Sequence, residues 1–502
     1  MPWRQQQREV GGVDVVDPLA PEPTAQFTEA LTTLHATAAR ATPAMPPVPT
    51  PELTGCRVLM WKQYPSLKVP GRRLVYLPGL VLGGPSDARI TTRGPTLSPA
   101  VGNANGDFIF PAGTPEADCA NAFAVVRQTL ALYERALGGE RIPWAWNVAG
   151  NVEPITVYPR GFATANACYS RYQKALTFGY FTPTQHNGDG RGANEVFTCR
   201  SLDIVAHQTA HAILDGLKPH WLNRAAPPQA AALHEAFADL TTIFVTLTQL
   251  DQVEAFVAMT EGDLHRKTFL PALAEHLGGA LGRPMGLENA DNDLRLIDVS
   301  NDVHDLSRVF TGAIFDILAD IYAFEVRRQH ASKDPARVLL EVTESLSSLV
   351  LQAFLAAPDS PAAYLDVINN MLTVSKKRSD PPLYRTVIRQ RFSRREIAGS
   401  PTPLKALIAG RMDWDDPSFT DGKDGEAMKP LQPSHPSAQQ WCPQDRSGCC
   451  GTMQLPEYAQ SSTKLDVDLQ RLAKLAPGEI LPDAAVLADE IAKLAFVSRA
   501  VG

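Results

Sequence analysis

The chain has 502 residues, more than one hydrophobic core usually supports, so two or more folded lobes are expected. Hydrophobic residues make up 44% and charged residues 20%, as in a globular protein, and the mild net charge of −7 argues against a nucleic-acid partner. No run of about 18 apolar residues and no N-terminal apolar segment occurs, so neither a membrane span nor a signal peptide is expected. The odd number of cysteines, seven, favours the cytoplasm over a disulfide framework.

Composition and hydrophobic periodicity divide the chain into four regions. Strands are expected around residues 73–77, 106–110, 144–146, 155–158 and 175–181, and helices over 117–137, 243–259, 309–328, 335–357 and 363–374. The four regions are a Pro/Ala-rich disordered arm with one short helix (1–50, helix 24–39), a mixed α/β part (51–215), a helical part (216–398), and an irregular extension with a last helix (399–502, helix 483–497).

The segment from Ser201 to Gly216 predicts a buried helix. Ser201 is a good N-cap, almost every residue that follows is apolar, and Gly216 begins a helix stop. His207 and His211 are four residues apart, so they share one helix face and can both reach one metal ion. The alternative is a pair of core histidines that are satisfied by hydrogen bonds.

A third ligand is predicted on the next apolar helix, which Pro227 and Pro228 open. Glu235 and Asp239 lie on one face of that helix. Two histidines and one glutamate are a standard zinc set that leaves a fourth position for water. Glu235 is therefore the expected third ligand, and Asp239 the expected acceptor for a ligand histidine's N–H. The alternative places both carboxylates on a solvated helix face.

Gln208 decides the expected chemistry. In metallopeptidases with the pattern H-E-x-x-H, the residue after the first histidine is the general base. Gln208 occupies that position, and its amide can hydrogen-bond a water but cannot take its proton. Gln is nearly the same size as Glu, so zinc binding should survive. Peptide hydrolysis should be largely lost, because general base catalysis is typically worth about 10²–10⁴-fold.

These segments resemble the thermolysin-like zinc metallopeptidases, the gluzincins. Residues Ile204–Asp215 are similar to that family's zinc helix, and His234–Asp239 to its third-ligand motif, although His234 stands where secreted members usually carry Asn. The resemblance covers roughly residues 105 to 395. It implies an α+β fold of two lobes, a mixed α/β N-terminal lobe and an all-helical C-terminal lobe, with the zinc site between them.

The resemblance also implies roles for residues outside the two motifs. Residues Asn166–Gly179 are similar to the edge strand that pairs with the substrate backbone, which makes Asn166 and Ala167 substrate-binding residues. His304, in Val303–Ser307, corresponds to the histidine that stabilises the oxyanion. Asp215, four residues after His211, joins Asp239 as a residue expected behind the metal ligands.

Two other polar segments are expected to be ordinary. The basic run Arg389–Arg395 is interpreted as a solvated helix end, and Asp291–Asp293 as an Asx-rich turn.

The sequence thus predicts a cytoplasmic protein that binds Zn²⁺ and a peptide or protein ligand, without nucleic acid or membrane, and hydrolyses peptides poorly. Gln208 is either natural, as in a pseudoenzyme, or an introduced change of a catalytic Glu. Two alternatives remain open: an active zinc hydrolase, through another base or with Glu restored at this position, and a structural protein that has lost the metal. The oligomeric state is not indicated.

Overall fold

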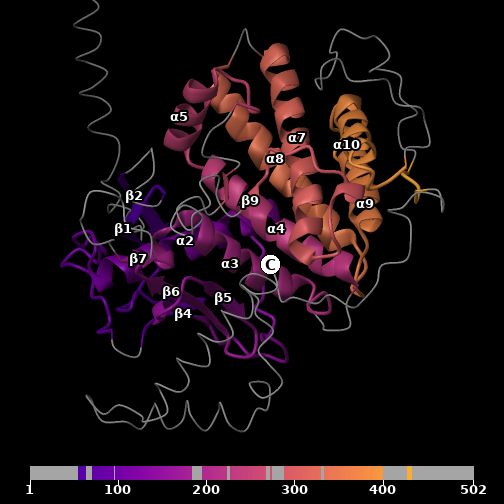
Figure 1. Ribbon diagram of the computed structural model, residues 1–502. Helices are drawn as coiled ribbons and strands as arrows, with labels where there is room; N and C mark the ends of the chain where they lie inside the picture. The colour runs from indigo at the N-terminus through magenta and orange to yellow at the C-terminus, as the bar shows by residue number, and fades with distance from the viewer. Residues whose placement is uncertain are drawn as a thin grey trace, which may run out of the picture. The chain divides into compact units, whose positions relative to one another are not determined.

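A computed structural model describes much of the chain between Gly55 and Leu431, in the ranges 55–63, 71–94, 97–183, 195–222, 227–266, 272–273, 288–329, 333–399 and 427–431. These residues hold nine β-strands and eight α-helices (Figure 1). The strands are β1 (Gly55–Trp61), β2 (Arg72–Pro78), β3 (Ile90–Thr92), β4 (Ile155–Phe162), β5 (Ala167–Ser170), β6 (Ala175–Phe181), β7 (Val196–Phe197), β8 (Ala272–Leu273) and β9 (Glu288–Asn289). The helices are α2 (Pro115–Ala136), α3 (Leu202–Leu217), α4 (Pro228–Leu247), α5 (Leu250–Thr260), α7 (Val303–Gln329), α8 (Pro335–Ala356), α9 (Tyr364–Lys377) and α10 (Pro382–Arg394). The described fold is therefore mixed α and β, with most strands before α3 and mainly helices after it.

The main sheet has the strand order β3-β4-β6-β5. Strands β3, β4 and β6 run parallel, β5 is antiparallel to β6, and the short β7 pairs with the far end of β6. Strand β5 closes the order on one side, so one of its edges has no strand partner among the described residues. The segment expected to supply an edge strand, Asn166–Gly179, forms this β5–β6 pair.

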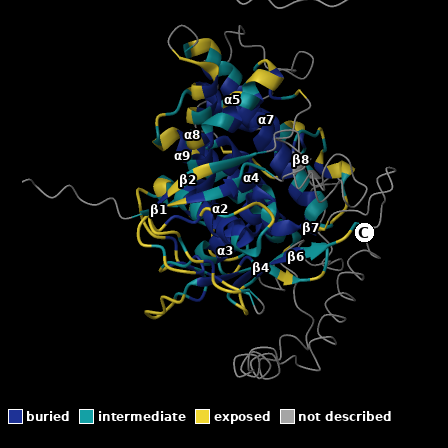
Figure 2. Cartoon of the chain, turned by 90° about the vertical axis from the view of Figure 1, so that its left-hand side faces the viewer, coloured by how far each residue is buried: buried dark blue, intermediate teal, exposed yellow. Residues whose placement is uncertain are grey.

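The helices are stacked outward from the sheet (Figure 1). Helix α2 packs on β1, β3 and β4, and α3 packs on α2 and β5. Helix α4 lies between α3 and α7, and α8, α9 and α10 complete the helical part. Figure 2 shows α2, α3 and α4 mostly in the colour of buried residues. Helix α3 ends the part of the chain that carries the sheet, and α4 opens the helical part. The two helices therefore pack against each other in the interior.

One hydrophobic core joins both parts. Buried side chains form a single cluster that runs from Val58 on β1 through Phe237 on α4 to Phe392 on α10. The described residues from Gly55 to Leu431 belong to one compact unit. The two lobes expected at 51–215 and 216–398 thus share one core. The arm 1–50 and almost all of the extension 399–502 lie outside the described residues, and so do the short helices expected in them.

Helices α4 and α8 are long and apolar enough to cross a membrane by length and composition alone. Within the protein, 94% of the apolar window of α4 and 61% of that of α8 are buried. Helix α4 also carries polar side chains that contact α3, which suits a core helix.

Several expected elements are present with shifted ends, and three are wrong. Residues 106–110 form no strand, only an isolated bridge from Phe108 to Val58. Residues 144–146 form a turn, in which Trp144 and Trp146 are apolar because their rings fill the core, and their indole N–H groups donate to backbone carbonyls. The helix expected over 243–259 is broken at Thr248, where the hydroxyl donates to the carbonyl of residue 245.

The expectation of a solvated basic helix end over Arg389–Arg395 is also wrong. Arg391 and Arg395 are buried against α7. The Arg391 guanidinium donates to Asp320 at 2.5 and 2.8 Å, and the Arg395 guanidinium donates to Asp316 at 2.9 Å. Because the paired carboxylates come some seventy residues earlier in the chain, the local charge pattern could not reveal this burial.

Candidate metal centre

Helix α3 carries two of the candidate ligands. Ser201 stands at its N-cap, but the Ser201 hydroxyl donates to Asp203 rather than accepting from the backbone. Gly216 lies inside the helix, which runs on to Leu217. A side chain at Gly216 would collide with the carbonyl oxygen of Pro143, so glycine is required by the close approach of that loop. This packing fixes the end of α3 against the loop that joins α2 to β4.

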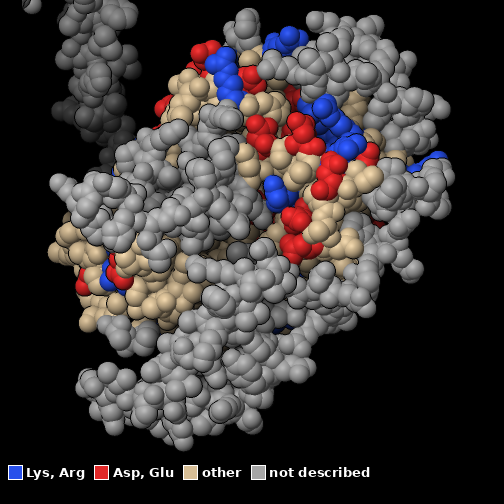
Figure 3. Space-filling view, viewed as in Figure 1, with Lys and Arg blue, Asp and Glu red and all other residues tan. Residues whose placement is uncertain are grey.

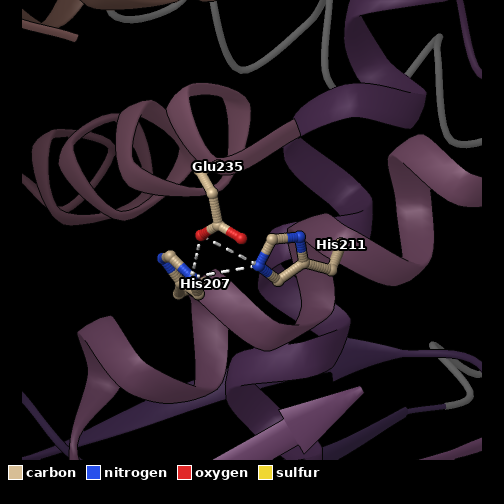
Figure 4. A group of neighbouring side chains, drawn as sticks. All are labelled: His207, His211 and Glu235. Carbon is tan, nitrogen blue, oxygen red and sulfur yellow. Dashed lines mark hydrogen bonds and ion pairs between the residues drawn. The ribbon is translucent and has the colours of Figure 1, made fainter. Parts of the chain in front are cut away.

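Two histidines of α3 and one glutamate of α4 converge on a single point (Figure 4). The Nε2 atoms of His207 and His211 are 3.0 Å apart. Glu235 Oε2 lies 3.4 Å from His207 Nε2 and 3.5 Å from His211 Nε2. A tetrahedral zinc ion with bonds of about 2.0–2.1 Å holds its ligand atoms about 3.3 Å apart. The three distances, 3.0, 3.4 and 3.5 Å, lie on either side of that spacing.

Each histidine is held from behind through its other ring nitrogen. His207 Nδ1 lies 3.1 Å from Asp239 Oδ1, so the structure brings Asp239 to the place expected for it. His211 Nδ1 lies 2.8 Å from Nδ1 of His234, a residue for which no role was predicted. Such partners orient the ring of a ligand histidine and select its tautomer.

Glu235 Oε1 and Asp239 Oδ2, the second oxygens of the two carboxylates at the site, are buried and have no hydrogen-bond partner among the described residues. The same holds for Gln208 Oε1, next to His207 in the chain, and for His234 Nε2, on the side of that ring away from His211. An unsatisfied buried polar group costs about 1–3 kcal/mol, so a cluster of them indicates a site that something else completes. Two imidazole nitrogens and a carboxylate suit zinc. The residues therefore fit a bound zinc ion.

The site's electrostatics favour a cation. Burial would raise the pKa of Glu235, but its electrostatic interactions with His211 and His304 and its hydrogen bonds with His207 and His211 hold it well below its usual range. Burial would lower the pKa of His207, whereas hydrogen bonds to Asp239 and Glu235 raise it to about 10. Burial lowers the pKa of His211. Glu235 is thus an ionised carboxylate, and without a metal His207 beside it holds a proton that a bound cation would have to displace.

His304, the expected oxyanion stabiliser, lies in the first turn of α7. Its Nδ1 is 3.8 Å from Glu235 Oε2, and its side chain is 24% exposed. His207 is 18% exposed, whereas His211 and Glu235 are sealed in the core. The open side of the centre is therefore the side of His207 and His304.

The two expected substrate residues flank the start of β5. The Asn166 side-chain oxygen accepts from the Ala167 N–H, and the Asn166 carbonyl accepts from Gly179 N–H. Ala167 is buried and pairs with Phe178 of β6. Strand β5 packs on α3, so these residues lie on the strand next to the helix of the candidate ligands.

Asp215 belongs to another network. Its carboxylate accepts from the Tyr169 hydroxyl at 2.7 Å and from the Arg171 guanidinium, which also donates to the carbonyl of Pro219. Among the described contacts, Asp215 therefore ties the end of α3 to β5 and the segment that follows it. Its expected place behind His211 is taken by His234.

A second group, His265, Asp291 and Asp316, also brings its ligand atoms within 4.8 Å of one another. His265 Nδ1 lies 2.9 Å from Asp291 Oδ1. Asp316 already contacts the guanidinium of Arg395 at 2.9 Å and that of Arg391 at 3.5 Å, and these two positive charges oppose a cation. The expected Asx turn is also present here, because the Asn292 side-chain oxygen accepts from the backbone N–H of Leu294.

No protein-family model matches the chain. No curated protein matches it either.

Proposed function

We propose that this chain binds one zinc ion through His207, His211 and Glu235 and holds a peptide or protein segment beside it. The observation that carries this proposal is the convergence of three ligand atoms, from two helices, at the mutual distances of a tetrahedral zinc site. The mixed sheet before α3 and the helices after it support, within the same proposal, a two-lobe fold of the thermolysin-like type.

Zinc, when bound here, would supply a Lewis acid for a carbonyl oxygen and acidify a bound water. Gln208, beside His207 on α3, can hydrogen-bond that water but cannot accept its proton. His304, on the open side, can donate to a developing negative charge. The edge of β5 that lacks a strand partner within the described ranges can add an extended peptide as a further strand. The chain's own groups thus favour holding a peptide over cleaving it.

An active hydrolase is the second candidate, and it needs a base other than Gln208. Within the described part of the chain, the carboxylates in contact with the two ligand histidines are Glu235 and Asp239. One is a candidate ligand and the other holds His207. This favours an impaired enzyme for the present sequence, while a glutamate at position 208 would complete a hydrolytic site in the same geometry.

Surface and thiol chemistry support the rest of the proposal, a cytoplasmic protein without a nucleic-acid or membrane partner. On the face drawn in Figure 3, Lys and Arg side chains are interspersed with Asp and Glu over the helical part. The four described cysteines, Cys56, Cys119, Cys168 and Cys199, are free thiols, as a reducing compartment would keep them.

The test compares the chain as it stands with Gln208→Glu. Zinc content would be measured on both proteins, followed by cleavage of a mixed peptide library. We expect one zinc per chain in both and cleavage only by Gln208→Glu, about 10²–10⁴-fold above the parent, because that variant regains a general base. Equal cleavage by both would reveal another base, and a chain that takes up no zinc would refute the proposal.

A further inference from the structure

His234 forms a hydrogen bond whose direction bears on metal binding. It precedes Glu235 on α4, is fully buried, and places its Nδ1 2.8 Å from Nδ1 of His211. The two rings are inclined by only 15°, with centroids 5.0 Å apart, which suits an N–H of one ring aimed edge-on at the nitrogen of the other. A single proton is shared in such a contact, so one imidazole donates and the other accepts.

The direction of this bond determines whether His211 can be a ligand. A neutral imidazole carries its proton on one nitrogen only. If the proton is on His211 Nδ1, it is donated to His234, and His211 Nε2 has a free lone pair at the metal position. If His234 donates instead, the proton of His211 sits on Nε2, where it points into the 3.0 Å gap to His207 and occupies the place of the metal.

We propose that His234 is the positioning residue that sets the tautomer and ring orientation of His211 for zinc. The inference rests on the proposed zinc site and deepens it. His207 is held by the carboxylate of Asp239, whereas His211 is held by a neutral imidazole. A carboxylate at position 234 would accept from His211 as well, but it would bury a second negative charge next to Glu235, and like charges in the interior are costly. A neutral acceptor orients the ring without that cost.

The acceptor can be removed while the packing is kept. His234→Phe retains an aromatic ring beside His211 but has no nitrogen. His234→Asn is the matched control, because the Asn Oδ1 atom is as many bonds from Cβ as the histidine Nδ1 atom and accepts in the same way. His234→Leu serves as a second apolar variant should the phenylalanine prevent folding.

Three quantities would be measured on the full chain: zinc affinity by competition with a chromophoric chelator, the visible absorption of the Co²⁺-loaded protein, and the thermal unfolding temperature of the metal-free protein. We expect His234→Phe and His234→Leu to bind zinc about 10–100-fold more weakly and to alter the Co²⁺ spectrum, as loss of an outer partner does. His234→Asn should restore both.

Two results would overturn the inference while leaving the zinc site intact. The first is a folded His234→Phe or His234→Leu protein that binds zinc as tightly as the parent. The second is equal weakening in His234→Asn, which would make the residue's shape, not its acceptor, the cause. Failure of the parent chain itself to bind zinc would instead remove the proposed function, and the inference with it.

Discussion

His207 and His211 are similar candidate ligands with different partners behind them. His207 contacts the carboxylate of Asp239 and is partly exposed to solvent. His211 contacts the imidazole of His234 and is fully buried. The i, i+4 spacing was sufficient to predict this pair, since it depends only on helix geometry. The partner of His211 could not be predicted, because it depends on how α4 is rotated against α3.

Asp239→Asn tests the carboxylate behind His207. The amide can still accept from His207 Nδ1, but it lacks the charge that strengthens this hydrogen bond. We expect zinc affinity to fall about 10–100-fold, measured by chelator competition. Asp215→Asn is the control, since Asp215 is an equally buried carboxylate whose partners are Tyr169 and Arg171.

Asp215→Asn should leave zinc affinity unchanged and lower the free energy of unfolding by about 1–3 kcal/mol, because it weakens the hydrogen bonds from Tyr169 and from Arg171, whose side chain is 43% exposed and remains solvated. If the two substitutions weakened zinc binding equally, the separation of the two networks would be refuted. That separation could not be seen in the sequence, where Asp215 and Asp239 occupy equivalent places four residues after a candidate ligand.

At the scale of elements, the long amphipathic helices were predictable and the loops were not. Helices α2 and α8 follow apolar periodicity with only small shifts at their ends, because that pattern reports the buried face directly. The strand predicted at Trp144–Trp146 was wrong, because aromatic residues in a buried turn have the composition of a strand. The solvated helix end predicted at the C-terminus of α10 was also wrong, because the carboxylates that pair with Arg391 and Arg395 are on α7.

The packing of α10 against α7 explains a glycine in the middle of a helix. A Cβ atom at Gly312 would lie 2.8 Å from Nη1 of Arg395 and 2.9 Å from Nδ2 of Asn292. The Arg395 guanidinium cannot easily move, because it donates to Asp316, to the Asn292 side chain and to the carbonyl of Leu294. A close approach of the two segments therefore requires glycine here.

Gly312→Ala should lower the free energy of unfolding by about 1–3 kcal/mol through overpacking, although alanine is the better helix former by about 1 kcal/mol. Chemical denaturation would measure the change. In an Arg395→Met background the collision with the guanidinium is relieved and only that with Asn292 remains, so the same substitution should cost less. A stabilised Gly312→Ala protein would contradict the close approach.

For the whole molecule, the shared core predicts that the metal stabilises more than its own neighbourhood. Both helices of the metal centre belong to the cluster that joins the sheet to the last helices. A ligand that binds only the folded state at a thousand times its Kd adds about 4 kcal/mol to the free energy of unfolding. The unfolding of the described part should therefore respond to zinc as one transition.

Calorimetry of the zinc-loaded protein with and without a chelator would check this. We expect one main transition that moves to lower temperature when zinc is removed, and no such shift in His211→Ala, which lacks a ligand. Two transitions, of which only one responds to the chelator, would show that the lobes unfold separately. The division at residues 215 and 216 that the sequence suggested would then describe energetics as well as chain order.

The uneven burial of the three ligands also has a kinetic consequence. His211 and Glu235 are sealed within the core, and only His207, with His304 nearby, opens to solvent. If zinc binds as proposed, an ion or a chelator would reach the site from the side of His207, and the bond to His207 would be the first to exchange. The lifetime of a bound ion would thus be set by how often the His207 ring swings outward, and by how firmly Asp239 restrains it.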